Sequence, residues 1–114
     1  MKTLHNGSCH CGRVRFEFDA AIDGAVSCNC SICVRKGAIL FAAPAESFRL
    51  LTSAADVSAY TFNTHAIVHR FCKICGIQPY SEHADRRSVY VNLRCVDGVD
   101  LASVPVMAFD GKSL

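Results

Sequence analysis

The sequence has no tryptophan, only two methionines and three prolines, and no long hydrophobic run. No apolar segment approaches the roughly 20 residues that a membrane-spanning helix requires. The first residues, MKTLHNGSCH, lack the apolar core of a secretory signal peptide. The net charge is +2, too small to predict a nucleic-acid or anionic-membrane partner. We therefore expect a cytoplasmic protein that binds neither nucleic acids nor membranes.

The length of 114 residues predicts a single domain, residues 1–114. Half of the residues are apolar, so the chain has enough hydrophobic side chains for a modest core. A chain of this size still benefits from covalent or metal cross-links, because small domains bury a smaller fraction of their surface.

Most of the patterning has a period of two, which is typical of half-buried β-strands. In RVRFEF, the apolar Val14, Phe16 and Phe18 share one face, and VYVNL alternates in the same way. No window shows sustained helical periodicity, although SICVRKG can form one helical turn that ends at Gly37. The sequence therefore predicts an all-β fold of many short strands. Further strands are expected at 38–43, 48–51, 59–62, 66–71 and 106–109, and Asp-Gly turns at 23–24, 97–98 and 110–111.

The eight cysteines indicate metal binding more than disulfides. Seven of them fall into the short-spaced groups SCHCG, CNCSIC and FCKICG. Disulfides usually join positions that are remote in sequence, whereas metal sites collect ligands in close pairs. Only Cys95 stands alone, and we interpret it as a small buried apolar residue and not as a nucleophile.

Two of these groups can form one closed site. Tetrahedral zinc holds its sulfur ligands about 3.8 Å apart, a spacing that C-x-C and C-x-x-C segments both reach. Gly12 and Gly76 follow the two pairs, where a glycine can adopt the positive φ of a tight turn. The sequence therefore predicts a structural zinc site that joins the N-terminal strand to the middle of the chain, with the ligands Cys9, Cys11, Cys72 and Cys75.

The third group predicts a different kind of site. Zinc with only three protein ligands keeps one position open for water or substrate. Three thiolates make zinc a weak Lewis acid that is suited to a soft ligand, and a thiol would bind there as its thiolate. The cofactor expected for the whole chain is therefore zinc, two ions per chain. The three ligands of the second, open site are Cys28, Cys30 and Cys33.

Two questions about this second site stay open at the level of sequence. A fourth ligand from elsewhere would close the site and make it structural. The next cations, Arg35 and Lys36, either balance thiolate charge, receive a substrate carboxylate or lie on the solvated surface. The candidates for a closing ligand are His10, His65, His69, His83 and Cys95.

The three cysteine motifs, their order and their surroundings resemble the glutathione-dependent formaldehyde-activating enzyme (GFA) family. The segments that carry this resemblance are GSCHCGRVRF, CNCSICVRKG and HRFCKICG, and it extends from about Gly7 to Gly111. YTFNTHAIVHRFCKICGIQPY and VNLRCVDGVDL are similar to the branch that includes centromere protein V. One departure is Asn29, where many members have histidine.

The resemblance implies several short, coiled antiparallel sheets organised around zinc, with the same division of the seven cysteines into a structural and a substrate-facing site. It also implies a carbon–sulfur lyase that joins glutathione, or a similar small thiol, to formaldehyde. No residue has a spacing that selects it as a general acid, although His65, His69 and His83 are available. The alternative function is a non-catalytic zinc β-module that carries glutathione or binds a protein.

Overall fold

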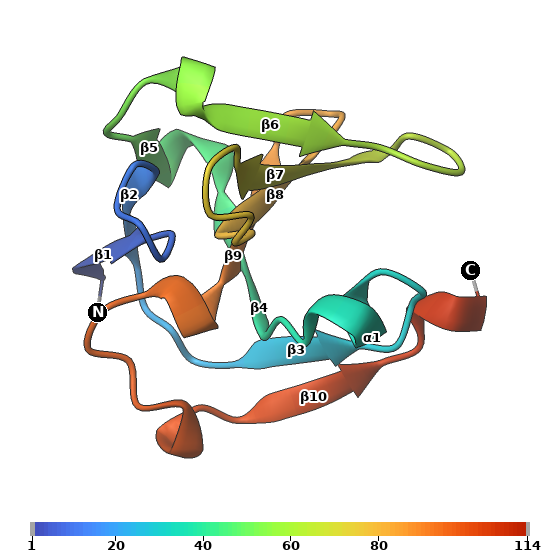
Figure 1. Ribbon diagram of the computed structural model, residues 1–114. Helices are drawn as coiled ribbons and strands as arrows, with labels where there is room; N and C mark the ends of the chain where they lie inside the picture. The colour runs from blue at the N-terminus through green and yellow to red at the C-terminus, as the bar shows by residue number, and fades with distance from the viewer. Residues whose placement is uncertain (1, 114) are drawn as a thin grey trace.

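A computed structural model describes residues 2–113, and its strands form two sheets (Figure 1). The smaller sheet has the order β1-β2-β5, with the bounds Thr3–Ser8, Arg15–Ala20 and Phe48–Leu50. The larger sheet has the order β10-β3-β4-β9-β8-β7-β6. In that order its strands are Val106–Phe109, Ala25–Cys28, Leu40–Pro44, Ser88–Asn92, Tyr80–His83, Ile67–Cys72 and Val57–Tyr60.

Helical structure is confined to short turns in the described residues. The single helical turn α1 spans Cys33–Lys36 and ends at Gly37, which has a φ of 64°. Both the turn and its end are where the sequence predicts them. Five 3₁₀ turns connect other elements, at Ala45–Ser47, Ala54–Asp56, Leu93–Cys95, Leu101–Ser103 and Gly111–Ser113. No helix within residues 2–113 is both long enough and apolar enough to cross a membrane.

The core is made where the two sheets face each other. Phe16 and Phe18 of β2 are fully buried. The ring of Phe16 lies 5.4 Å from that of Phe48 in β5, and Phe48 lies 4.7 Å from Tyr80 in β8. These aromatic contacts join the smaller sheet to the larger one, since offset ring pairs at this separation are favourable beyond the area that they bury.

The period-two pattern correctly predicts the inward faces of β2 and β9. Val14, Phe16 and Phe18 are all buried, and so are Val89 and Val91. The all-β prediction is confirmed, with small sheets and cysteine clusters that can hold zinc. Among residues 2–113, every strand pairing is antiparallel except one: β10 runs parallel to β3, with Val106 beside Ala25 and Phe109 beside Cys28.

Three local predictions differ from the structure. The segment 59–62 leaves its strand after Tyr60, because the chain turns there and the Phe62 carbonyl accepts from the His65 N–H. The pair 23–24 lies in an irregular segment and not in a turn, since the next residue, Ala25, is already paired with Pro105. The strand expected for VYVNL ends at Asn92, because the chain enters the 3₁₀ turn Leu93–Cys95.

Candidate metal centres

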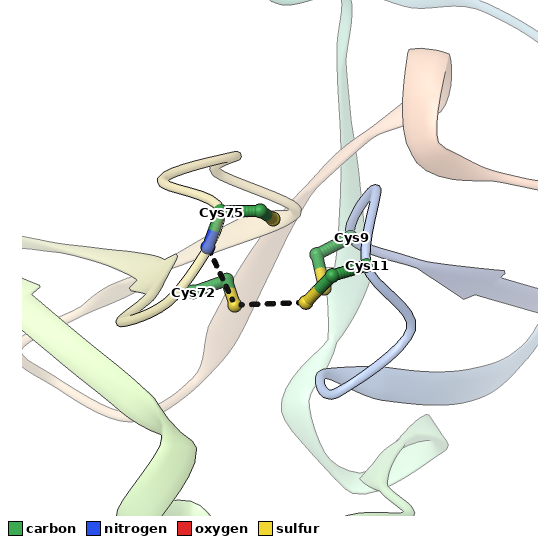
Figure 2. Close-up of side chains that lie close together, drawn as sticks. All are labelled: Cys9, Cys11, Cys72 and Cys75. Carbon is green, nitrogen blue, oxygen red and sulfur yellow. Dashed lines mark hydrogen bonds between the residues drawn. The ribbon is translucent and has the colours of Figure 1, made fainter.

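The first cluster joins the β1–β2 connection to the end of β7. Figure 2 shows Cys9 and Cys11 facing Cys72 and Cys75 across this junction. The Sγ atoms of Cys9 and Cys11 are 3.7 Å apart, and those of Cys11 and Cys72 are 3.6 Å apart. All four sulfurs lie within 4.8 Å of one another.

Local backbone geometry explains why these segments present their sulfurs together. Gly12 has a φ of 83° and Gly76 a φ of 79°, so each follows its cysteine pair with a turn that favours glycine. After the second pair, the Gly76 N–H donates to the Cys72 carbonyl at 2.9 Å. The predicted role of the two glycines therefore agrees with their conformations.

Backbone N–H groups favour the thiolate forms of Cys72 and Cys75, whereas the pKa of Cys11 is raised to about 11. The Val14 N–H donates to Cys9 Sγ, and the N–H groups of Ile74 and Cys75 donate to Cys72 Sγ, each at 3.4 Å. The Cys75 N–H bond is the largest contribution to a lowered pKa at Cys72. Burial raises the pKa of Cys75, but N–H groups from Ile77 and Cys11 lower it, and the net value is about 6. Thiolate is the form that binds metal.

The donor set and its spacing fit zinc. Four thiolate ligands in a tetrahedron with Zn–S bonds of about 2.3 Å have their sulfurs about 3.8 Å apart. The two measured separations, 3.7 and 3.6 Å, are close to that value. A metal with four cysteine ligands has no position left for a substrate in tetrahedral geometry.

The second cluster lies in the connection from β3 to α1. Cys28 ends the strand, Cys30 lies in the connection and Cys33 begins the helical turn. The Cys30 N–H donates to Cys28 Sγ at 3.4 Å, and the three sulfurs lie within 4.8 Å of one another. Within residues 2–113, no histidine, carboxylate or further cysteine joins this group as a fourth potential ligand. The three-sulfur donor set again fits a borderline-soft metal such as zinc.

Two thiols of this cluster differ electrostatically. Burial raises the pKa of Cys33 to about 12, with a further contribution from its bond to Cys30. Burial also acts to raise the pKa of Cys30, but hydrogen bonds from Cys33 and Cys28 bring it below its ordinary value. The thiol of Cys30 therefore ionises more readily than that of Cys33.

A C-terminal segment is fastened to the loop of this cluster. The Asn29 side chain donates to Asp110 Oδ1 at 2.9 Å, and its oxygen accepts from the Lys112 N–H at 2.9 Å. The Asn29 backbone N–H donates to the Phe109 carbonyl at 3.2 Å. We call this set of bonds the Asn29 clasp. Figure 1 shows the C-terminal turn beside α1, away from the β1–β2 connection.

The two cations after the cluster have different surroundings. Arg35 is exposed and donates to the Ser31 carbonyl at 2.8 Å, so it lies on the surface of the helical turn. Lys36 is half-buried, and burial lowers its pKa against the opposing effect of Cys28, Cys30 and Cys33. Lys36 is thus the one of the two cations that interacts electrostatically with the cluster, and it acts to lower the pKa of Cys33.

A cleft of about 490 Å³ opens beside the second cluster. Cys28 and Cys33 line it together with apolar side chains from α1 and β10. Arg94, which no sequence pattern marks as a site residue, also lines it. The complete lining in the described residues is Ser27, Cys28, Asn29, Cys33, Val34, Gly37, Ala38, Ile39, Arg94, Ala108, Phe109 and Asp110.

The histidines considered from sequence lie outside this cleft. His65 contacts Thr61 Oγ1 at 2.7 Å, and His83 lines a different cleft, of about 650 Å³. His69 is buried against Gln78, and burial lowers its pKa to about 4, so it is neutral at neutral pH. None of the three belongs to either cysteine cluster.

Cys95 also stays separate from both clusters. Its sulfur accepts a weak hydrogen bond from the Asn92 side chain at 3.7 Å, and burial raises its pKa to about 11. A thiol with a raised pKa is a poor nucleophile at neutral pH. Cys95 is partly buried and packs against the core, so it is less buried than the sequence interpretation expects.

Fold and clusters together define a class: an all-β protein with two cysteine clusters that can hold metal ions, both with donor sets consistent with zinc. Within that class, the chain belongs to the glutathione-dependent formaldehyde-activating enzyme family, whose sequence model matches residues 4–109. The resemblance recognised in the cysteine motifs is thereby confirmed at the level of the family. The similarity to the centromere protein V branch stays a prediction.

A solved structure supports the same fold. The crystal structure of a Rhodobacter sphaeroides protein, a structural genomics target, is 31% identical to this chain, with a TM-score of 0.79. The match covers 90% of this chain and 99% of the other. The arrangement of strands described above is therefore similar to one seen experimentally.

Proposed function

We propose that the protein is a zinc-dependent carbon–sulfur lyase. It would bind glutathione or a similar thiol at the three-cysteine cluster and make or break an S-hydroxymethyl-type adduct. The observation that carries this proposal is the second cluster, which has three sulfur ligands, no fourth protein ligand within residues 2–113 and a cleft beside it. The family to which the chain belongs is named for glutathione and formaldehyde.

The proposal gives the two clusters different roles and a zinc ion each. Cys9, Cys11, Cys72 and Cys75 would hold a closed structural ion, and Cys28, Cys30 and Cys33 an ion with one open position. When bound at the second site, zinc supplies deprotonation of an incoming thiol and fixes the position of its sulfur.

The reaction balances without an oxidant or reductant. In the forward direction the thiol sulfur forms a bond to the carbonyl carbon, and the proton lost by the thiol returns to the carbonyl oxygen. The reverse direction breaks the same carbon–sulfur bond. Lys36 would offset the negative charge of the cysteine thiolates, since all three lie within its electrostatic reach. No histidine lines the cleft within residues 2–113, so we assign the proton transfer to water.

The all-sulfur donor set also favours a second candidate, a non-catalytic glutathione carrier. A thiolate held by zinc is less nucleophilic than a free thiolate, and aldehydes add to thiols without an enzyme. A carrier would bind the thiol at the same cluster and leave the rate of adduct formation unchanged.

Two measurements on one preparation test the proposal. The first is a glutathione titration of the cobalt-substituted protein, followed by the thiolate-to-cobalt charge-transfer bands. The second is the exchange rate between formaldehyde and S-hydroxymethylglutathione, measured by NMR with and without the zinc protein. We expect glutathione to change the cobalt spectrum and the zinc protein to accelerate exchange.

The matched variants are Cys30→Ser, which removes one ligand of the second cluster, and Cys95→Ser, which removes a thiol outside both clusters. Acceleration should be lost in the first and kept in the second. An unchanged cobalt spectrum at millimolar glutathione would refute thiol binding. Binding without acceleration would establish the carrier.

A further inference from the structure

Arg94 lines the cleft, and hydrogen bonds of the neighbouring backbone position its turn. It lies in the 3₁₀ turn Leu93–Cys95 that follows β9. Leu93 is buried and donates its N–H to the Ile39 carbonyl at 2.7 Å, while the Arg94 N–H donates to Asn92 Oδ1 at 3.2 Å. The base of the Arg94 side chain is therefore fixed against the segment that follows α1.

The guanidinium group of Arg94 also forms a hydrogen bond, but with only one of its N–H donors. Its Nε donates to the carbonyl of Gly37, the residue that ends α1, at 3.0 Å. An arginine has five N–H donors in a planar fork. Among residues 2–113, no acceptor pairs with the two Nη atoms of Arg94, and no carboxylate forms an ion pair with it.

Apart from the metal-binding cysteines, the described lining of the cleft offers no free anion that would neutralise Arg94. The other charged side chain among the described lining residues is Asp110. One Asp110 oxygen accepts from the Asn29 side chain at 2.9 Å and the other from Ser113 Oγ. The carboxylate of Asp110 is thus engaged in the Asn29 clasp, and the cleft presents a cation with open donors.

The remaining lining residues of the cleft connect the three-cysteine cluster with Arg94. Cys28 and Cys33 of the three-cysteine cluster are part of its wall, and Val34, Ile39 and Phe109 make much of the remainder apolar. A ligand whose sulfur lies at the cluster can therefore extend along a largely apolar surface toward Arg94. Arginine binds carboxylates with two parallel hydrogen bonds, and its planar fork is arranged for this before the ligand arrives.

We infer that Arg94 is a specificity-determining residue whose free Nη donors bind a carboxylate of the incoming thiol. This inference rests on the proposed function for the identity of the site. Arg94 would thus favour a thiol that carries a carboxylate, such as glutathione, over simple neutral thiols.

A purely structural role is the competing explanation, because arginine side chains often donate to the last carbonyls of a helix. In that case Arg94 would support α1 through Gly37 and would be indifferent to the charge of the ligand. The two roles separate in a comparison of ligands: a structural residue alters stability or the affinity for every thiol, and a carboxylate-binding residue alters the preference for acid over ester.

The test compares glutathione with its dimethyl ester, which keeps the thiol and lacks both carboxylates. Both are titrated into the cobalt-substituted protein. Because a hydrogen bond to a charged group contributes about 1.5–3 kcal/mol, we expect the acid to bind about tenfold to hundredfold more tightly than the ester. In Arg94→Gln this preference should fall to near unity, with the affinity for the ester unchanged.

Two further variants serve as controls for the comparison of acid and ester. Arg86→Gln removes the same charge from an arginine that lines the other cleft, and it should keep the full preference. Arg94→Lys keeps the charge without the planar fork, so it should keep only part of the preference for the acid. If Arg94→Gln does not fold, Arg94→Lys takes its place in the comparison. An equal affinity for acid and ester in the unaltered protein would overturn the inference, as would an undiminished preference in Arg94→Gln.

S-methylglutathione separates failure of this inference from failure of the proposed function. It retains both carboxylates but has no thiol to ionise. We expect it to shift the Arg94 Nε–H resonance in NMR spectra, and its dimethyl ester to leave that resonance in place. A shift together with an unchanged cobalt spectrum for glutathione would refute the thiol–metal mechanism alone. A changed cobalt spectrum with no Arg94 shift would refute the carboxylate subsite alone.

Discussion

At the scale of single residues, Gly111 lies against the sulfur of Cys28, one of the ligands of the three-cysteine cluster. A Cβ atom at this position would stand 2.6 Å from Cys28 Sγ and 3.3 Å from Cys30 Cβ. Real Cβ atoms essentially never approach another heavy atom as closely as 2.6 Å, so a side chain at 111 must displace the C-terminal turn or the cysteine loop. The glycine is required by close approach and not by an unusual φ.

We therefore predict that Gly111→Ala weakens metal binding at the three-cysteine cluster. A loss of about tenfold, equivalent to about 1.4 kcal/mol, is expected because the ligands must shift from their favoured positions. Competition with a chromogenic chelator measures it. Gly24→Ala is the matched control, since a Cβ there meets only Pro105 O at an ordinary 3.6 Å. Equal metal affinity in the two variants would contradict this explanation of Gly111.

The residues of the site differ in how well sequence alone predicts them. The cysteines of both clusters follow from their spacing, because ligands two or three positions apart must face the same way locally. Arg94 does not, because its partner Gly37 is 57 residues away and no local pattern marks the pair. Asn29 is marked only as a departure from the family's usual histidine, and its purpose becomes visible once Asp110 and Lys112 are placed beside it.

At the scale of elements, the four-cysteine cluster joins parts of the chain that have no strand pairing with each other. It links the β1–β2 connection, in the smaller sheet, to the end of β7, in the larger one. The three-cysteine cluster instead draws all its ligands from one connection, between β3 and α1. Loss of metal from the first should therefore affect how the two sheets are held together, and loss from the second should not.

We predict that Cys72→Ser abolishes cooperative unfolding, whereas Cys30→Ser removes one metal ion and leaves a folded protein. Binding of a structural zinc contributes about 10–16 kcal/mol, as much as the whole stability of about 5–15 kcal/mol that a small domain has. Circular dichroism during thermal melting, together with zinc analysis, measures both effects. The same loss of cooperativity in the two variants would contradict the division into structural and open sites.

The elements themselves are predicted from sequence to differing extents. β2 and β9 alternate apolar and polar residues clearly, so their inward faces follow from the pattern alone. β1 and β8, with the sequences TLHNGS and YSEH, are too polar to be recognised as strands. The parallel pairing of β10 with β3 joins segments that are remote in the chain, and periodicity within a segment carries no information on its partner.

At the scale of the whole molecule, the two clusters predict a stepwise response to chelation. Three protein ligands hold a metal less securely than four, and the three-cysteine cluster borders a cleft. We expect two zinc ions per chain by elemental analysis. A chelator should release one of them rapidly with no change in circular dichroism, and the other slowly as the protein unfolds.

Cys30→Ser is the control for this experiment, because it should lack the rapid phase and keep the slow one. Release of both ions in a single phase, together with loss of folded signal, would show that the clusters are not independent. One ion per chain that does not increase when zinc is added back would remove the second site and, with it, the proposed lyase chemistry.

The Asn29 clasp also bears on the order in which the two clusters can be completed during synthesis of the chain. Proteins are made from the N-terminus, so Cys28, Cys30 and Cys33 leave the ribosome long before their support does. Asn29 precedes Asp110 by 81 residues, and Cys11 precedes Cys72 by 61. A nascent chain can therefore complete its four-cysteine cluster while the loop of the other cluster is still unclasped. The loop of the three-cysteine cluster therefore gains this support only after residue 112 has been synthesised, as one of the last steps of folding.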